Sequence, residues 1–202
     1  MKLFIFHFYQ ETILWLQDED KTFERKVNER AISSIFYNLI EDILKESKKD
    51  YSYIEYIAFI NGPGSFTSLR FFLTFIKALS VSYPEIKMIP LNILEVMAFS
   101  LDGENDIVMG GSRKFLKYFH HAKYFKSNTE FTLIKEIEVT PYDKVSKLNP
   151  LYIGVEPDFD IKSYTPTLND MKNISEYKIK NKLIEDIISL TPYYYKSFRE
   201  TI

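Results

Sequence analysis

The chain has 202 residues and a mass of 24.0 kDa, which suits one domain of ordinary size or two small lobes. Hydrophobic residues make up 46% of the sequence and aromatic residues 16%, so a substantial core can form. A net charge of −2 argues against strong autonomous binding to a polyphosphate backbone, and the lack of cysteine excludes disulfides, thiolate zinc sites and cysteine nucleophiles.

Two short hydrophobic runs at the start of the chain, residues 3–8 and 12–17, predict a β-hairpin. The first run is too short to span a membrane, and no small-residue cleavage site follows it. We therefore expect a soluble, cytoplasmic protein without a membrane contact.

Asn28 is the predicted N-cap of the first helix, because hydrophobic residues follow it at helical spacing. These residues are Ile32, Ile35, Phe36, Leu39, Ile40, Ile43 and Leu44. Residues 54–60 then predict a buried strand. A long helix is predicted from Phe66 to Tyr83, where Pro84 stops it.

The rest of the chain alternates between predicted strands and helices. A strand over 86–89 precedes a helix capped by Asn92, and a turn at 102–105 is the predicted boundary between a lobe of residues 1–102 and a smaller lobe of residues 103–202. The predicted elements of the second lobe are strands over 107–109, 115–125, 131–139 and 151–155, a helix starting at Thr140, an irregular stretch over 157–175 and a helix over 181–189. We expect the terminal segment to return toward the first lobe.

A turn between the strand and the long helix, Gly62-Pro63-Gly64-Ser65, allows two interpretations. The free N–H groups at a helix N-terminus can hold an anion, with Arg70 as the first long cationic side chain. The segment nevertheless matches neither phosphate-binding glycine motif. The alternative is a strand-to-helix turn that needs tight backbone packing, with Ser65 as the helix cap.

The long helix is apolar over most of its circumference. Beside its core stripe it carries Phe71, Phe75 and Ala78, and the preceding helix offers Phe36, Tyr37 and Ile40 as companions. A helix with two apolar sides either packs on both within the chain or exposes an interface.

The stretch from Gly62 to Arg70, GPGSFTSLR, is similar to the GPGSFTGLR signature of the TsaB (YeaZ) family and differs from it only at Ser68. The hairpin and the helix before the motif are also similar to that family. Arg113 and Tyr118 fall where the family has a DAR…VY segment, and the stretch from Pro192 to Lys196 resembles its C-terminal P-x-Y-L-R. The resemblance is strongest over residues 1–100.

The resemblance implies an α/β, actin-like or ribonuclease H-like (ASKHA) fold of two lobes, the second reduced. It implies a non-catalytic subunit that binds a TsaD-like paralogue, which carries the metal and the active site for modifying an adenosine of transfer RNA. A TsaE-like ATPase would join the larger complex, tRNA contact would be indirect, and the family also forms homodimers. The implied partner surface comprises Phe36, Tyr37, Ile40, Phe71, Phe75 and Ala78.

Departures from the family pattern also point to a degenerate, non-catalytic member. The first strand of this fold usually ends in an acidic D-T-[SA] segment, and here it reads His7-Phe8-Tyr9. Gly111 and Ser112 replace the first two residues of DAR. Without these acids the chain lacks the anchor for a metal-bound phosphate. We expect no catalytic residue, no metal and no cofactor.

Other chemistries have weaker signals. His120 and His121 are adjacent, so on a strand they point to opposite faces, and we interpret them as partly exposed strand residues rather than metal ligands. Ser65 lacks a nucleophile elbow, and the basic and aromatic residues of 113–126 fit a half-buried strand as well as an RNA contact. The alternatives to a partner subunit are a nucleotide-hydrolysing or peptidase-like enzyme and a stand-alone homodimer.

Overall fold

The structure, a computed structural model, describes residues 1–8, 10–29, 32–110, 118–128, 130–145, 147–148, 150–153 and 164–193. These residues divide into two units. The first comprises Met1–Asn92 together with the segment from Met171 onward, and the second comprises Ile93–Asp170.

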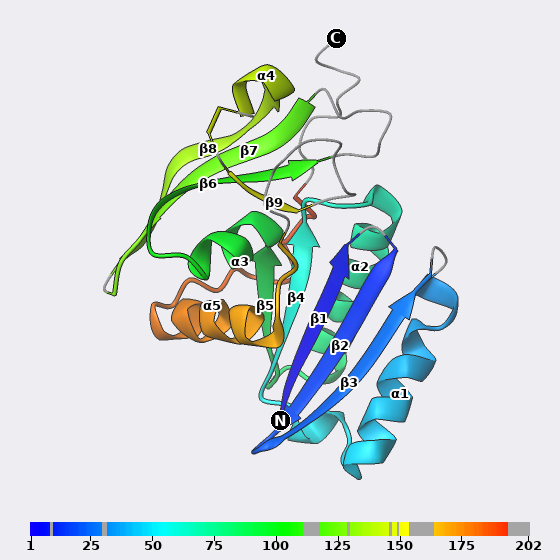
Figure 1. The fold of residues 1–202 in the computed structure, drawn as a ribbon. Coiled ribbons are helices and arrows are strands. Elements are labelled where there is room, and N and C mark those ends of the chain that lie inside the picture. The colour runs from blue at the N-terminus through cyan, green and yellow to red at the C-terminus, as the bar shows by residue number, and fades with distance from the viewer. Residues whose placement is uncertain are drawn as a thin grey trace. The chain divides into compact units, whose positions relative to one another are not determined.

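The first unit is built on one sheet with the strand order β3-β2-β1-β4-β5 (Figure 1). Its strands are β1 (Lys2–Phe8), β2 (Glu11–Asp18), β3 (Lys21–Asn28), β4 (Tyr56–Gly62) and β5 (Lys87–Asn92). The first three strands are antiparallel neighbours, whereas β1 with β4 and β4 with β5 are parallel pairs. The predicted hairpin and the predicted buried strand are therefore confirmed.

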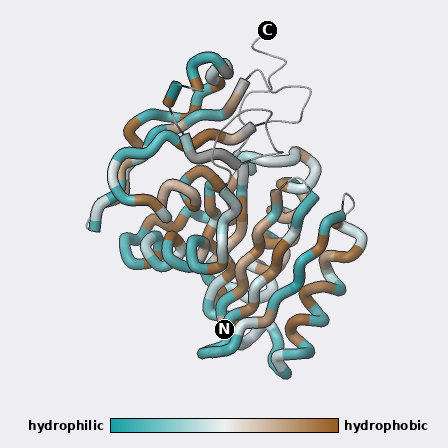
Figure 2. Tube along the Cα trace, in the orientation of Figure 1, coloured by the Kyte–Doolittle hydropathy of each residue, from teal (hydrophilic) through white to brown (hydrophobic). Residues whose placement is uncertain are grey.

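Helices α1 (Phe36–Ser47) and α2 (Phe66–Ser82) cover one face of this sheet. Short 3₁₀ turns, η1 (Ile32–Ser34) and η2 (Tyr51–Tyr53), flank α1. The helices and strands contribute to one buried cluster, in which Leu3, Ile57 and Phe72 are at most 1% exposed. In Figure 2 brown and teal stretches alternate along α1, as expected for a helix with one buried face.

The predicted start of the first helix at Asn28 is wrong. Residues 21–28 form β3, which pairs along its whole length with β2, and α1 begins only at Phe36. The cause is an alternation with period two, in which Phe23 and Val27 pack against the core between exposed polar residues.

The second unit has a sheet of order β8-β7-β6-β9. Its elements are α3 (Ile93–Phe99), β6 (Gly103–Gly110), β7 (Tyr118–Lys126), β8 (Phe131–Pro141), α4 (Tyr142–Val145) and β9 (Leu151–Ile153). Strand β6 pairs antiparallel with β7 and parallel with β9. Helix α3 follows Asn92, as predicted, and α4 follows the predicted start at Thr140-Pro141.

The prediction fails between residues 168 and 189. Helix α5 (Leu168–Lys180) begins within the stretch over 157–175 that was expected to be irregular and extends beyond it, and turns occupy most of the predicted helix over 181–189. Asp170 accepts hydrogen bonds from the backbone N–H of Thr167 (2.8 Å) and from its hydroxyl (2.7 Å), which fixes the start of α5. Buried Met171 and Ile174 then anchor the helix.

No helix within the described ranges is long and apolar enough to cross a membrane.

Candidate functional site

The end of β1 carries a buried histidine. His7 is 3% exposed, its Nδ1 lies 2.8 Å from the Thr12 hydroxyl on β2, and its ring centroid lies 4.9 Å from that of Phe72. Burial lowers the pKa of His7 to about 4, so the imidazole is neutral near neutral pH. This strand end therefore presents a neutral ring in place of a carboxylate. Tyr9, the last residue of the His7-Phe8-Tyr9 segment that replaces the acidic family motif, lies outside the described residues.

The signature loop joins β4 to α2. Ser65 occupies the N-cap position of α2, as predicted, but its side chain makes no capping hydrogen bond. Gly62 has φ +129°, a conformation that favours glycine, and Pro63 is buried, whereas Gly64 is exposed. The guanidinium of Arg70 lies 3.9 Å from the ring centroid of Phe66, one turn earlier.

Asn61 connects this loop to a distant part of the chain. Its side-chain amide nitrogen donates to the backbone carbonyl of Thr191 (3.0 Å), and its backbone carbonyl accepts from the backbone N–H of Tyr193 (2.9 Å). Sequence reasoning missed this contact, although the P-x-Y resemblance at Pro192 marked the same segment. The remainder of that motif, residues 194–196, lies outside the described residues.

The residues predicted as a partner surface divide into two groups. Phe36 and Ile40 are 0% exposed and belong to the core, so they cannot themselves touch a partner. The Phe36 ring packs edge-on against Phe71 and Phe75, with centroids 5.6 and 5.1 Å apart.

The other group reaches the surface. Tyr37 is 61% exposed, Ala78 is exposed, and Phe71 and Phe75 are half-buried. We call these four residues the outer ridge. Its members on α2 follow one another at intervals of three and four, so they line one side of that helix.

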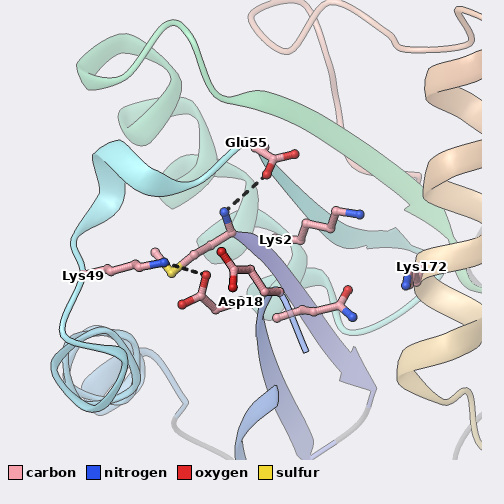
Figure 3. Close-up of a pocket in the computed structure, with 8 residues that line it drawn as sticks. Lys2, Asp18, Lys49, Glu55 and Lys172 are labelled. Carbon is pink, nitrogen blue, oxygen red and sulfur yellow. Dashed lines mark hydrogen bonds and ion pairs between the residues drawn. The ribbon is translucent and has the colours of Figure 1, made fainter. Parts of the chain in front are cut away.

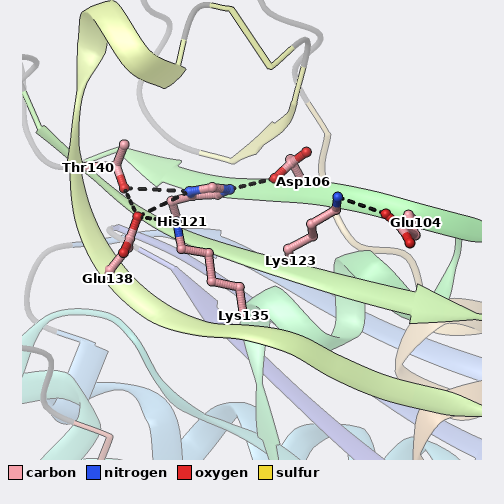
Figure 4. Close-up of polar contacts among 7 residues, drawn as sticks. All are labelled: Glu104, Asp106, His121, Lys123, Lys135, Glu138 and Thr140. Atoms are coloured by element: carbon pink, nitrogen blue, oxygen red, sulfur yellow. Dashed lines mark hydrogen bonds and ion pairs between the residues drawn. The ribbon is translucent and has the colours of Figure 1, made fainter.

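The second unit holds a polar cluster around His121 (Figure 4). Its Nε2 lies 2.7 Å from Asp106 on β6, and its Nδ1 faces Thr140 and Glu138 on β8, at 3.5 and 3.9 Å. Lys135 in turn pairs with Glu138 at 2.5 Å. These contacts tie three strands together.

The expectation of partly exposed histidines on β7 is wrong, because His120 is 7% and His121 3% exposed. Burial lowers the pKa of His120 to about 4. Within the described part of the chain, no group of three or more histidine, cysteine, aspartate or glutamate side chains is arranged to hold a metal ion.

Two aromatic residues of the basic segment at 113–126, Phe119 and Tyr124, are core residues, and Phe125 is half-buried. Phe119 and Tyr124 are 0% and 3% exposed, and Lys123 pairs with Glu104 at 2.7 Å. They therefore form the half-buried strand that was one of the two interpretations. Gly111, Ser112 and Arg113 lie outside the described residues.

A crevice of about 310 Å³ lies beside the start of β1 (Figure 3). Two ion pairs join charged groups that line it: Lys49 contacts Asp18 at 2.7 Å, and the N-terminal ammonium of Met1 contacts Glu55 at 3.5 Å. Lys2, also in the lining, contacts Glu176 outside it at 3.1 Å. The hydrogen bond to Asp18 raises the pKa of Lys49. None of the motifs of the sequence maps to this crevice.

Comparison with known protein families gives one match over most of the chain. The model of TsaD, described as tRNA N6-adenosine threonylcarbamoyltransferase, matches residues 26–155. A curated relative from Buchnera aphidicola, the tRNA threonylcarbamoyladenosine biosynthesis protein TsaB, is 27% identical over 146 residues. That alignment covers 67% of this chain and 64% of the relative, so it spans less than two thirds of the relative's length.

Two solved structures from Pseudomonas aeruginosa share the fold. One is described as an uncharacterized protein with similarity to peptidase YEAZ, with a TM-score of 0.73, 14% identity and coverage of 96% of this chain and 99% of the other. The other is YeaZ, with a TM-score of 0.71, 15% identity and the same coverage. Together with the five-stranded mixed sheet and the match to the TsaD family model, these likenesses confirm the predicted α/β, actin-like fold.

Proposed function

The chain belongs to the TsaD-type family and, within it, to the TsaB (YeaZ) group, and from this we propose its function. It is a non-catalytic subunit that binds and stabilises a TsaD-like paralogue in threonylcarbamoyladenosine biosynthesis on transfer RNA. The outer ridge is the observation that carries this proposal. A TsaE-like ATPase belongs to the larger complex, and the tRNA contact of this chain is indirect.

The outer ridge has the composition of an interface. Tyr37 leaves most of a large aromatic side chain in water, and the half-buried rings of Phe71 and Phe75 continue the apolar surface onto α2. Interfaces are enriched in tyrosine and phenylalanine, which supply contact area with few rotatable bonds. The buried rings of Phe36 and Phe72 support this surface from below: the Phe36 ring contacts Phe71 and Phe75, and the Phe72 ring lies 5.3 Å from that of Phe71.

The non-catalytic role draws support from the end of β1. An actin-like ATPase needs an acid there to handle a metal-bound phosphate, as the resemblance implies. His7 is instead neutral, buried and hydrogen-bonded to Thr12, so it supplies neither negative charge nor an exposed ligand.

Mixing the purified chain with a TsaD-like subunit and measuring the mass by light scattering tests the proposal. We expect a complex with the parent chain and with Asn173→Asp, which places a charge on an exposed part of α5. We expect none with Ala78→Asp, because that variant brings an unpaired carboxylate into the contact without disturbing the core. A complex that forms equally well with Ala78→Asp would overturn the assignment of this surface.

Light scattering of the isolated chain, without the TsaD-like subunit, shows whether the chain forms a homodimer. If the outer ridge also joins two copies of this chain, Ala78→Asp converts a homodimer to a monomer in light scattering. Homodimer formation by the parent that excludes the TsaD-like subunit would favour the stand-alone homodimer instead.

A further inference from the structure

The segment of residues 186–193, which we call the strap, runs beside α2 to the end of β4. The ammonium of Lys77 on α2 donates to the carbonyl of Ile188 at 2.8 Å. Farther along, Thr191 and Tyr193 form the two hydrogen bonds with Asn61 described above. The two residues of each hydrogen bond are more than a hundred positions apart in sequence, so each bond closes a long loop of the chain.

The strap is itself well ordered by local contacts. The carboxylate of Asp186 accepts from the N–H groups of Ile188 (3.2 Å) and Ser189 (3.3 Å), which closes a turn. Leu190 is 5% exposed and belongs to the same buried cluster as Leu73 and Ile76 of α2. The strap is therefore held to α2 by one buried side chain and one charged hydrogen bond.

The first glycine of the signature makes room for the strap. A Cβ atom on Gly62 would lie 2.8 Å from the backbone carbonyl oxygen of Tyr193, closer than Cβ atoms approach other atoms, and 3.1 Å from the Cβ of Tyr193, which is an unusually tight contact. The second glycine differs, because a Cβ on Gly64 would meet Leu69 at an ordinary 3.6 Å. The signature turn thus needs a glycine at residue 62 where the backbone of the strap passes.

We propose that the signature loop is the docking site of the strap, and that strap docking is coupled through α2 to the partner surface. Helix α2 packs Leu73 and Lys77 toward the strap and presents Phe71, Phe75 and Ala78 on the outer ridge. A strap that leaves the loop changes how α2 is held, and by reciprocity a bound partner strengthens strap docking. The coupling rests on the proposed function, whereas the docking does not.

Hydrogen exchange of the isolated full-length chain tests the docking. Gly62→Ala should accelerate exchange at the Tyr193 amide by about tenfold or more, because the hydrogen bond to Asn61 opens. Gly64→Ala is the matched control and should leave that amide unchanged. Equal protection of the Tyr193 amide in both variants would overturn the docking.

A double-mutant cycle separates the strap from the backbone strain at Gly62. Tyr193→Pro removes the N–H that binds Asn61 while keeping the full chain. If the strap is the reason for the glycine, Gly62→Ala should lower the urea midpoint much less in the Tyr193→Pro background than in the parent. If Gly62→Ala lowers the urea midpoint equally in both backgrounds, the whole loss of stability comes from the positive φ of residue 62, and the docking role is refuted.

Partner affinity tests the coupling separately. Tyr193→Pro should weaken binding of the TsaD-like subunit by about fivefold or more, the lower range of measured couplings. Unchanged affinity with a released strap would refute the coupling. If the parent itself binds no such subunit, the proposed function fails, and the exchange experiment still decides the docking.

Discussion

Replacing Tyr37 with serine is the most direct probe of the outer ridge. Tyr37 is 61% exposed, and a tyrosine has about 200 Å² of surface to bury, so about 120 Å² is available to a partner. At about 25 cal/mol per Å² full coverage contributes about 3 kcal/mol. The hydroxyl part remains polar, so we expect Tyr37→Ser to lose about 2 kcal/mol, which is a Kd about 30-fold weaker.

Isothermal calorimetry with the TsaD-like subunit measures this loss. Leu183→Ser is the matched control, because Leu183 is an apolar residue of similar exposure, 53%, that follows α5 and lies off the outer ridge. Both variants should unfold at the urea midpoint of the parent, since neither side chain is buried. A Kd for Tyr37→Ser within about twofold of that for Leu183→Ser would refute the reasoning, because it would place Tyr37 outside the contact.

Phe36→Ala should lower the free energy of unfolding by about 3–5 kcal/mol in urea titrations, whereas Tyr37→Ala should cost little, which would confirm that neighbouring residues of α1 divide between core and surface. Thr167→Ala should cost about 1 kcal/mol in the same titrations through loss of the contacts with Asp170, and exposed Thr165→Ala should be neutral. Because burial lowers the pKa of His7 to about 4, the unfolded chain takes up this proton first as the pH falls below about 6.5, and stability is lost from there down to about pH 4. Between about pH 7 and about pH 5, the free energy of unfolding of His7→Leu should therefore fall by about 2 kcal/mol less than that of the parent. An equal fall in both proteins would show that His7 does not cause this pH dependence. Calorimetry with ATP and magnesium should detect no tight binding, and metal-dependent binding would favour the enzyme alternative.

Helix α2 was predictable because local and global signals agree there. Its apolar residues recur at helical spacing, a glycine-rich turn precedes it and Pro84 follows it. Strand β3 and helix α5 were not predictable in the same way, because both are rich in charged residues. In β3 only Phe23 and Val27 carry the alternation, and in α5 the capping pair Thr167 and Asp170 lies in a polar stretch that also fits a loop.

The site was only partly predictable for a different reason. Hydropathy identifies Phe36, Tyr37 and Ile40 as apolar, but which of them reaches the surface depends on how α1 rotates against the sheet. The hydrogen bond between Asn61 and Thr191 joins residues 130 positions apart, and no periodicity reports a pairing over such a distance. Single-sequence patterns describe local preference, whereas burial and long-range contacts follow from the packing.

Helix α2 connects the signature loop with the proposed partner surface. One side of the helix carries Leu73 and Lys77, which hold the strap, and another carries Phe71 and Phe75, which belong to the outer ridge. On the proposed function, substitutions at Ala78 should therefore change partner contacts without touching the strap, and substitutions at Gly62 should change the strap without touching the partner. If both substitutions weaken partner binding while only Gly62→Ala releases the strap, the helix transmits strap docking to the partner surface. That pattern would assign to the glycine-rich turn a mechanical role in partner binding.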